Sequence, residues 1–187
     1  YFNPPNKRRM FMLLKHNNLI IRNATVDDAE QLSLWWNDGD VMAHAGFPHG
    51  TGQTVQEIST SLRTDTDNTH RRLMIEINNI AVGEMNYRNK GNKTAEIGIK
   101  ICDFSKQNKG FGKILLSMLI FSLFNDMRYQ RIILDTNVKN ERAQHVYEQL
   151  GFKKLRVNEN SWKNQVGELQ SSIDYELFQK DFNNFAE

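Results

Sequence analysis

The sequence predicts a single α/β layered domain with a mixed sheet of about seven strands and about four helices. Two observations predict this class. Short β-branched and apolar runs alternate with longer segments whose apolar residues recur at helical spacing. In addition, the 187 residues suffice for one domain, which at this size buries about 70% of the surface of its unfolded chain.

The first part of the chain reads as a short apolar strand at residues 19–22 followed by two helices. The first helix, residues 25–36, opens with a cap and acidic residues and repeats its apolar side chains on one face. A loop rich in glycine and proline spans residues 43–53. The second helix then begins with a capping box at residues 54–57.

Three strands are expected next. Residues 72–77 and 80–87 are apolar runs joined by two asparagines, as in a β-hairpin. After a turn, residues 94–101 alternate strictly between apolar and other residues. We therefore expect this strand to bury one face and to carry on the other face three residues: Glu96, Gly98 and Lys100.

The second half continues the alternation of helix and strand. The helix at residues 110–125 is apolar on nearly every side, which predicts that it is buried against a sheet. Residues 131–138 form an apolar run typical of a central strand. A helix at residues 140–152 ends at a glycine. Residues 152–158 and 172–178 are read as the last two strands.

Composition argues against several classes of partner. The net charge is only +2, and no aromatic-interleaved stripe joins the short basic clusters, so we expect no nucleic acid. The longest apolar stretch, residues 114–124, is shorter than the roughly 20 residues of a membrane span, so we expect no membrane. Scattered histidines without a CxxC or HExxH pattern predict no metal site.

Two further features concern location and chain ends. The single cysteine, Cys102, excludes an internal disulfide and is typical of a reducing compartment, so we expect a cytoplasmic protein. We interpret Cys102 as a small buried apolar residue rather than a nucleophile. Residues 1–11 are interpreted as a tail, either added or disordered, and residues 12–187 as the domain.

The segment KQNKGFGKILL, residues 106–116, places two glycines where a helix must begin. Glycine costs about 1 kcal/mol relative to alanine inside a helix, so its use here needs a reason. A strand, a glycine turn and a helix N-terminus together are typical of a phosphate site, to which Lys109 and Lys113 add positive charge. The segment matches neither a Walker loop nor a Rossmann motif. A plain turn is the alternative interpretation.

This loop resembles the Q/R-x-x-G-x-G/A motif of the GNAT superfamily of acetyl-CoA-dependent N-acetyltransferases. A second family element, N-x-x-A-x-x-x-Y-x-x-x-G-F, lies a helix and a strand further on, as the family order requires. The fixed positions of the two elements are Gln107, Gly110, Gly112, Asn140, Ala143, Tyr147, Gly151 and Phe152. The resemblance covers residues 19–178 and implies a mostly antiparallel sheet. It is nearest in look to the branch of ribosomal-protein and aminoglycoside acetyltransferases.

The resemblance implies that acetyl-CoA is the co-substrate and that no metal takes part. In the family the coenzyme pyrophosphate lies on main-chain amides of the loop, here Gln107, Asn108, Lys109, Gly110, Phe111, Gly112 and Lys113. The family's fourth strand bulges and splays from the fifth, and its main chain pairs with the pantetheine arm. The positions implied for that pairing are Lys100, Ile101 and Cys102, with Asn140 near the same arm.

The resemblance also implies the catalytic residues. Tyr147 is the expected general acid for the departing thiolate, and its alternative role is a core tyrosine. Glu96 is the expected base, and its alternative role is an exposed strand glutamate. Glu84 and Asp135 are expected to suit the role of base less well.

The amine acceptor is expected to be a small molecule or a protein N-terminus. The family's acceptor channel implies a lining of aromatic residues and histidines, namely Trp35, Trp36, His44, Phe47, His49 and Trp162. An aminoglycoside, or a non-catalytic acetyl-CoA-binding module, are the alternatives. An aminoglycoside site should be acidic, but residues 35–53 supply only Asp38 and Asp40. We expect a monomer or a homodimer.

Overall fold

The structure is a computed structural model, and it describes residues 12–186. The predicted tail therefore lies outside the described residues, apart from which the predicted fold class is confirmed. One mixed sheet contains eight strands in the order β1-β2-β3-β4-β5-β6-β8-β7. The strands are β1 (Leu13–His16), β2 (Leu19–Asn23), β3 (His70–Ile77), β4 (Ile80–Asn89), β5 (Thr94–Ile101), β6 (Arg131–Asn137), β7 (Lys153–Lys163) and β8 (Leu169–Phe178).

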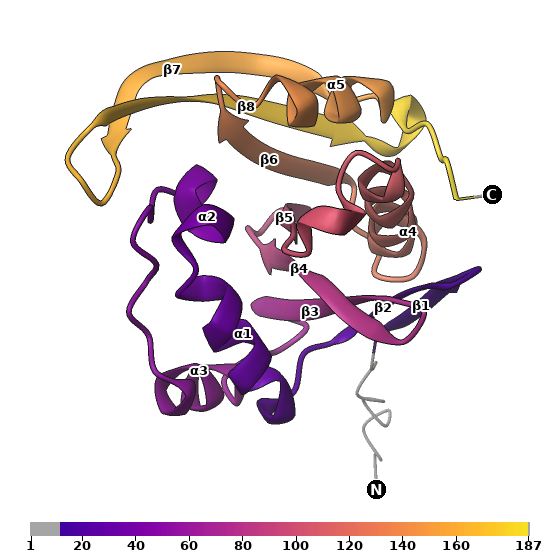
Figure 1. The fold of residues 1–187 in the computed structure, drawn as a ribbon. Helices are drawn as coiled ribbons and strands as arrows, with labels where there is room; N and C mark the ends of the chain where they lie inside the picture. Colours follow the sequence, from indigo (N-terminus) through magenta and orange to yellow (C-terminus); the bar gives the residue numbers. More distant parts are fainter. Residues whose placement is uncertain (1–11, 187) are drawn as a thin grey trace, which may run out of the picture.

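Five α-helices flank the sheet in the described part of the chain (Figure 1). They are α1 (Ala29–Trp36), α2 (Gly39–Met42), α3 (Val55–Leu62), α4 (Phe111–Asn125) and α5 (Glu141–Gln149). Neighbouring residues of β3 show that the helices lie on both faces. Leu73 and Ile75 belong to the core that includes α4, whereas Met74 packs with α1 and α3. The molecule therefore has three layers around one sheet.

Local sequence explains most element boundaries. β5 has the predicted bounds, and the hairpin between β3 and β4 turns at Asn78 and Asn79, whose φ angles are 54° and 61°. Thr54 and Glu57 form the predicted capping box of α3, because each side chain accepts a hydrogen bond from the main-chain amide of the other. The apolar helix α4 is buried as predicted, and β6 is central.

Two elements of the structure were not predicted from the sequence. β1 is a four-residue edge strand that pairs with β2, and α2 is a single turn whose amides at Asp40 and Val41 donate to the Asp38 carboxylate. Both are too short to show a periodic pattern, so tertiary contacts rather than propensity define them.

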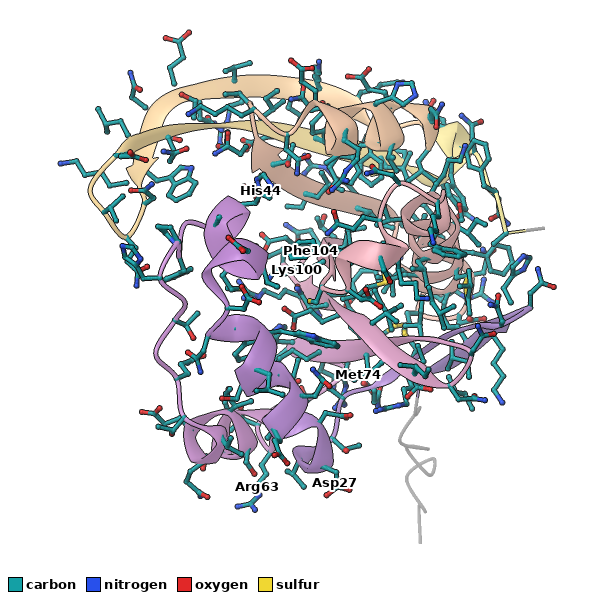
Figure 2. All side chains as sticks on the ribbon, viewed as in Figure 1. Asp27, His44, Arg63, Met74, Lys100 and Phe104 are labelled. Carbon is teal, nitrogen blue, oxygen red and sulfur yellow. The ribbon has the colours of Figure 1, made fainter. Side chains whose placement is uncertain are left out.

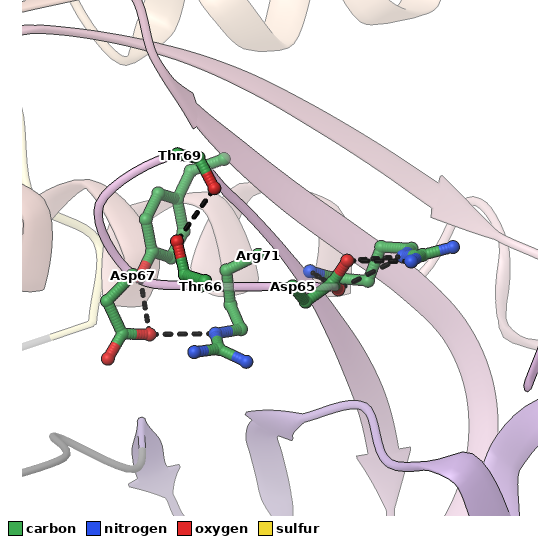
Figure 3. A network of polar contacts seen from close by, with 7 residues as sticks. Asp65, Thr66, Asp67, Thr69 and Arg71 are labelled. Carbon is green, nitrogen blue, oxygen red and sulfur yellow. Dashed lines mark hydrogen bonds and ion pairs between the residues drawn. The ribbon is translucent and has the colours of Figure 1, made fainter. Parts of the chain in front are cut away.

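A polar network connects residues 65–69, the segment that follows α3, to β3 (Figure 3). Arg72 donates to the Asp65 carboxylate, with 2.6 Å between Nη2 and Oδ1, and these side chains are 9% and 2% exposed. Arg71 pairs with Asp67 at 2.7 Å, and the Tyr87 hydroxyl donates to the same carboxylate at 3.2 Å. Because the charges are paired and hydrogen-bonded, the ion pairs offset the cost of removing them from water, and they fix the segment that follows α3 against β3 and β4.

Candidate functional site

The two central strands separate partway along their length. β5 and β6 are parallel, and three residue pairs join them: Thr94–Arg131, Ala95–Ile132 and Glu96–Ile133. Beyond these pairs both strands continue, to Ile101 and Asn137, without pairing to each other. Figure 1 shows the resulting division, with β6, β7 and β8 set apart from β1–β4. One edge of β5 is thus left with main-chain groups that no strand satisfies.

The direction of the main-chain N–H and C=O groups alternates along β5, and this determines which of them point toward β6 where the two strands separate. The Lys93 carbonyl accepts hydrogen bonds from the Gln130 and Arg131 amides, at 2.8 and 3.3 Å, so it faces β6. Main-chain direction repeats every second residue along a strand, so Ile99 and Ile101 face the same way. Ile99 is not among the residues predicted from the sequence, although a period of two from Ile101 indicates it.

The other two predicted main-chain positions, Lys100 and Cys102, face β4 instead. The Cys102 amide donates to the Val82 carbonyl at 2.8 Å, so this amide is already used. The register of β5 with β4 is continuous as far as Ile101. The Asp103 amide also donates to the Val82 carbonyl, at 3.0 Å, so the two strands have the hydrogen-bond pattern of a bulge at Cys102 and Asp103, directly after β5. Gly83 allows the close approach there, since a Cβ on it would lie 2.3 Å from the Lys100 carbonyl oxygen.

The loop after β5 ends at an open helix N-terminus. Gly110 is the N-cap of α4, with φ at 79°, and it has no side chain to accept from the first amides of the helix. A Cβ built on Gly110 would meet no atom within 4 Å, so the space in front of the helix is open. Phe111 anchors the first turn by packing partly against the core, while Lys109 is exposed. This geometry suits an anion.

The Gln107 side chain connects this loop to the edge of β5. Its Nε2 donates to the Ile101 carbonyl at 2.8 Å, and its Oε1 accepts from the Arg142 guanidinium at 3.2 Å. Arg142 also donates to the Asn108 side chain at 2.9 Å. Arg142 was not predicted, although it lies between two fixed positions of the second family element. It brings a positive charge to the loop.

Two predicted cofactor residues have side chains engaged elsewhere. Asn140 caps α5, with its Oδ1 accepting from the Ala143 amide at 3.2 Å. Lys113 donates to Gln149 at 3.2 Å, and its Nζ lies 4.1 Å from the centroid of the Phe185 ring. The Lys113 side chain therefore supports α4 and α5, and its main-chain amide is what remains for the loop site. Asn140 also uses its main chain, because its amide donates to the Asn137 carbonyl at 2.9 Å and its carbonyl accepts from the Gln144 amide at 3.2 Å.

Tyr147 lies on α5 and is 8% exposed. Its ring meets the rings of Phe152 and Tyr175 edge-on, with centroids 5.8 and 5.7 Å away. Burial, and then the charge of Asp135, raise the pKa of Tyr147 to about 12. Among the described residues the only fully buried unpaired side-chain polar atoms belong to Asn23 and Asp181, and no residue hydrogen-bonds the Tyr147 hydroxyl. The hydroxyl is therefore protonated, reachable by solvent and free to donate.

Glu96 lies at the last residue pair before the strands separate. Its two oxygens pair with Arg88 at 3.7 Å and with Lys90 at 3.2 Å. Asp135 stands on β6 beyond this point. The surrounding protein, followed by the charges of Glu96 and Asp174, raises the pKa of Asp135, although its side chain keeps contact with solvent.

The predicted acceptor residues come from two parts of the chain. Trp35 and Trp36 pack against a small cluster of buried side chains, Val41, Met42 and Cys102. His44, Phe47 and His49 are exposed in the loop that follows α2. Trp162 on β7 lies against that loop, since a Cβ on Gly46 would come 2.5 Å from its ring.

Gln165, in the turn between β7 and β8, connects this hairpin to the loop that follows α2 by hydrogen bonds. Its amide donates to the Gly46 carbonyl at 2.8 Å, and its Nε2 donates to the Gly50 carbonyl at 2.9 Å. Its Oε1 accepts from the His49 amide at 2.9 Å. Gln165 was not predicted, and no local pattern indicates it, because its partners lie more than 100 residues away.

A family model for the acetyltransferase (GNAT) domain matches residues 18–153, a range that contains the separated strands, the glycine loop and Tyr147. The chain belongs to the GNAT acetyltransferase family. A comparison with curated protein sequences gives no significant match.

Solved structures of GNAT acetyltransferases share this fold. A probable acetyltransferase superposes with a TM-score of 0.78 at 20% identity, covering 91% of this chain and 99% of that chain. The spermidine N-acetyltransferase from Vibrio cholerae, solved with CoA and spermine, gives 0.78 at 21% identity over 88% and 97%. The RimL ribosomal L7/L12 α-N-protein acetyltransferase, solved with coenzyme A, gives 0.76 at 16% identity over 89% and 98%.

Within this GNAT domain the Cys102 thiol should react slowly. Burial, and then the charge of Glu84, raise its pKa to about 12, so it is protonated at neutral pH. Because the thiolate is the reactive form, alkylation by iodoacetamide at pH 7.5 should be at least about 100-fold slower in the folded protein than in urea. Mass spectrometry over a time course measures this. Rapid labelling of the folded protein would show that Cys102 is an accessible thiolate.

No helix in residues 12–186 is long and apolar enough to cross a membrane. Nor do three or more His, Cys, Asp or Glu side chains in that range gather as a metal ion would require.

Proposed function

We propose that this GNAT acetyltransferase transfers the acetyl group of acetyl-CoA to a primary amine by direct attack, without an acetylated enzyme. The observation that carries the proposal is the continuity of the open β5 edge with the uncapped N-terminus of α4. The Ile99 and Ile101 main chain supplies strand-like partners for an extended amide-containing arm. Gly110 then supplies a helix N-terminus for the phosphates of the same molecule.

Arg142 and Gln107 prepare this surface for the coenzyme. Gln107 donates to the Ile101 carbonyl, and Arg142 holds Gln107 in place. A guanidinium beside outward-pointing amides adds charge-assisted hydrogen bonds to a phosphate. The Lys109 ammonium, on the exposed side of the loop, adds long-range attraction.

The reaction requires a neutral amine and a protonated leaving group. An alkylammonium has a pKa near 10.4, so it must first lose a proton. Its nitrogen then forms a bond to the thioester carbon while the bond from carbon to sulfur breaks. The Tyr147 hydroxyl donates its proton to the departing sulfur. The nitrogen loses its second proton after the attack, and the Tyr147 phenolate takes up a proton in its place. Of the two protons that the ammonium loses, one is thus balanced by the proton on coenzyme A and one passes to solvent.

The acceptor class follows from chemistry rather than from the neighbours' substrates. Spermidine and a ribosomal protein are the acceptors that two neighbours' names state, and both present a primary amine. An aminoglycoside gains no support from residues 35–53, because Asp38, one of the two acidic residues in that segment, uses its carboxylate to cap α2. A cytoplasmic location and a monomeric or homodimeric state are further proposals from the sequence.

An acceptor screen tests the proposal. Free thiol released from acetyl-CoA is followed with spermidine, kanamycin and a hexapeptide with a free N-terminal serine. At least one amine should release thiol faster than hydrolysis alone, with the acetylated product visible by mass spectrometry. Acetyl-CoA should raise the melting temperature, since a ligand of the folded state stabilises it. Thermal stabilisation without turnover of any amine would indicate a binding module.

A further inference from the structure

Glu84 is a carboxylate on β4. From the sequence, Glu96 was expected to suit the role of general base better. The Glu84 side chain is 12% exposed. Its Oε1 accepts from the Trp36 indole at 2.8 Å and from the Lys100 ammonium at 3.1 Å. Lys100 in turn lies 2.9 Å from the Met42 sulfur, between β5 and α2 (Figure 2). Glu84 is thus held by α1 and β5 on the side of the sheet where the predicted acceptor residues lie.

The second oxygen of Glu84 is not used. Both hydrogen bonds go to Oε1, and no described residue donates to Oε2. Oε2 is also absent from the fully buried unpaired atoms, which among described residues are those of Asn23 and Asp181, so it reaches solvent. A largely buried carboxylate gains most from a donor on each oxygen, and a donor from outside the protein can still bind here.

The position of Glu84 relative to the open edge of β5 favours it over Glu96 as the proton acceptor. Glu84 is the register partner of Lys100, which lies beyond the last residue pair of β5 with β6. Adjacent strands are about 4.8 Å apart and β5 lies between, so the main chain of β4 is roughly 10 Å from a group bound along that edge. The Glu84 side chain covers part of this span, and an amine or a water molecule next to it covers the rest. Glu96 instead lies where β5 and β6 are still paired, and cations engage both of its oxygens.

We propose that Glu84 binds the acceptor ammonium through Oε2 and takes its proton, directly or through one water. Trp36 and Lys100 fix the carboxylate by occupying Oε1, which leaves Oε2 aimed at the acceptor. The proton then passes to solvent, and the neutral nitrogen attacks the thioester carbon as described above. This inference rests on the proposed function and assigns the proton acceptor within it.

Glu84→Gln tests the assignment, with Glu96→Gln as the matched control. Glutamine keeps the oxygen that accepts from Trp36 but removes the charge that binds an ammonium. For each amine acetylated among spermidine, kanamycin and the hexapeptide, kcat/KM for the amine should fall about 100-fold in Glu84→Gln. KM for acetyl-CoA should change less than about threefold, and so should every constant of Glu96→Gln.

The outcomes separate the two proposals. If no amine is acetylated by the unaltered protein, the proposed function fails and the inference with it. If an amine is acetylated but Glu84→Gln keeps its rate, or Glu96→Gln alone loses it, only the inference is overturned. Should Glu84→Gln not fold, as judged by melting with acetyl-CoA, Glu84→Asp replaces it. That variant keeps the charge and shortens the reach, so it should lose about tenfold in kcat/KM for the amine, and an unchanged value overturns the inference.

Discussion

Tyr147→Phe should lower turnover by about 10²–10⁴-fold, the usual scale for a lost general acid. The substitution removes one hydroxyl that no described residue hydrogen-bonds and leaves the ring contacts with Phe152 and Tyr175 in place. Because the interaction with the leaving sulfur forms mainly in the transition state, kcat and kcat/KM should fall together. Steady-state kinetics and thermal unfolding of the same variant measure both properties.

Tyr175→Phe is the matched control for this prediction. Tyr175 is fully buried beside Tyr147, and its hydroxyl, unlike that of Tyr147, is already engaged, because it donates to Glu148 at 3.4 Å. Removing this hydroxyl should leave turnover within about threefold while testing the same change of side chain. Full activity in a destabilised Tyr147→Phe protein would contradict the general-acid role and make Tyr147 a core residue.

Gly110→Asp should weaken coenzyme A binding by about 100-fold. The added carboxylate would face the phosphates at the start of α4, and two unit charges about 5 Å apart repel by about 3 kcal/mol at an effective dielectric constant of 20. Each 1.4 kcal/mol corresponds to about tenfold in affinity. The space before Gly110 is empty, so the side chain itself meets no obstacle. Isothermal titration calorimetry with coenzyme A gives the affinity.

Gly91→Asp controls for backbone strain. Gly91 lies in the turn between β4 and β5 with φ at 80°, against 79° for Gly110, and a Cβ there also meets no atom within 4 Å. Both variants should therefore lose similar stability from the left-handed conformation. Only Gly110→Asp should lose coenzyme affinity. Equal affinities in the two variants would show that the loop does not bind the phosphates.

Local signals in the sequence account for most of the fold. The alternation of residues 94–101 predicts the bounds of β5, and Asn78 and Asn79 predict a hairpin because asparagine tolerates positive φ. The all-round apolar character of α4 predicts its burial. The motif glycines locate the loop, since the spacing of glycine before a helix is a property of consecutive residues.

The site is less predictable because contacts between distant segments define it. Gln165 meets residues more than 100 positions away, and Glu84 is held by Trp36, 48 positions earlier. The periodicity of apolar residues along the chain does not indicate such contacts between distant segments. The main-chain direction of Lys100 and Cys102 was also missed, because it depends on the register of β5 between two neighbours rather than on side-chain pattern.

The separation of β5 from β6 makes the domain two small sheets, of five and three strands, that share a three-residue seam. An extended ligand lying along the free edge of β5 would continue the pairing that the seam begins, with Ile99 and Ile101 in place of Thr94–Glu96, so the same edge of one strand serves both sheet pairing and ligand binding. Ala95 and Ile132 pair within this seam and are fully buried. Because a close-packed interior transmits changes in volume, a larger or smaller side chain at either position should shift one sheet relative to the other and so alter coenzyme binding, although neither residue is among those proposed to contact the coenzyme.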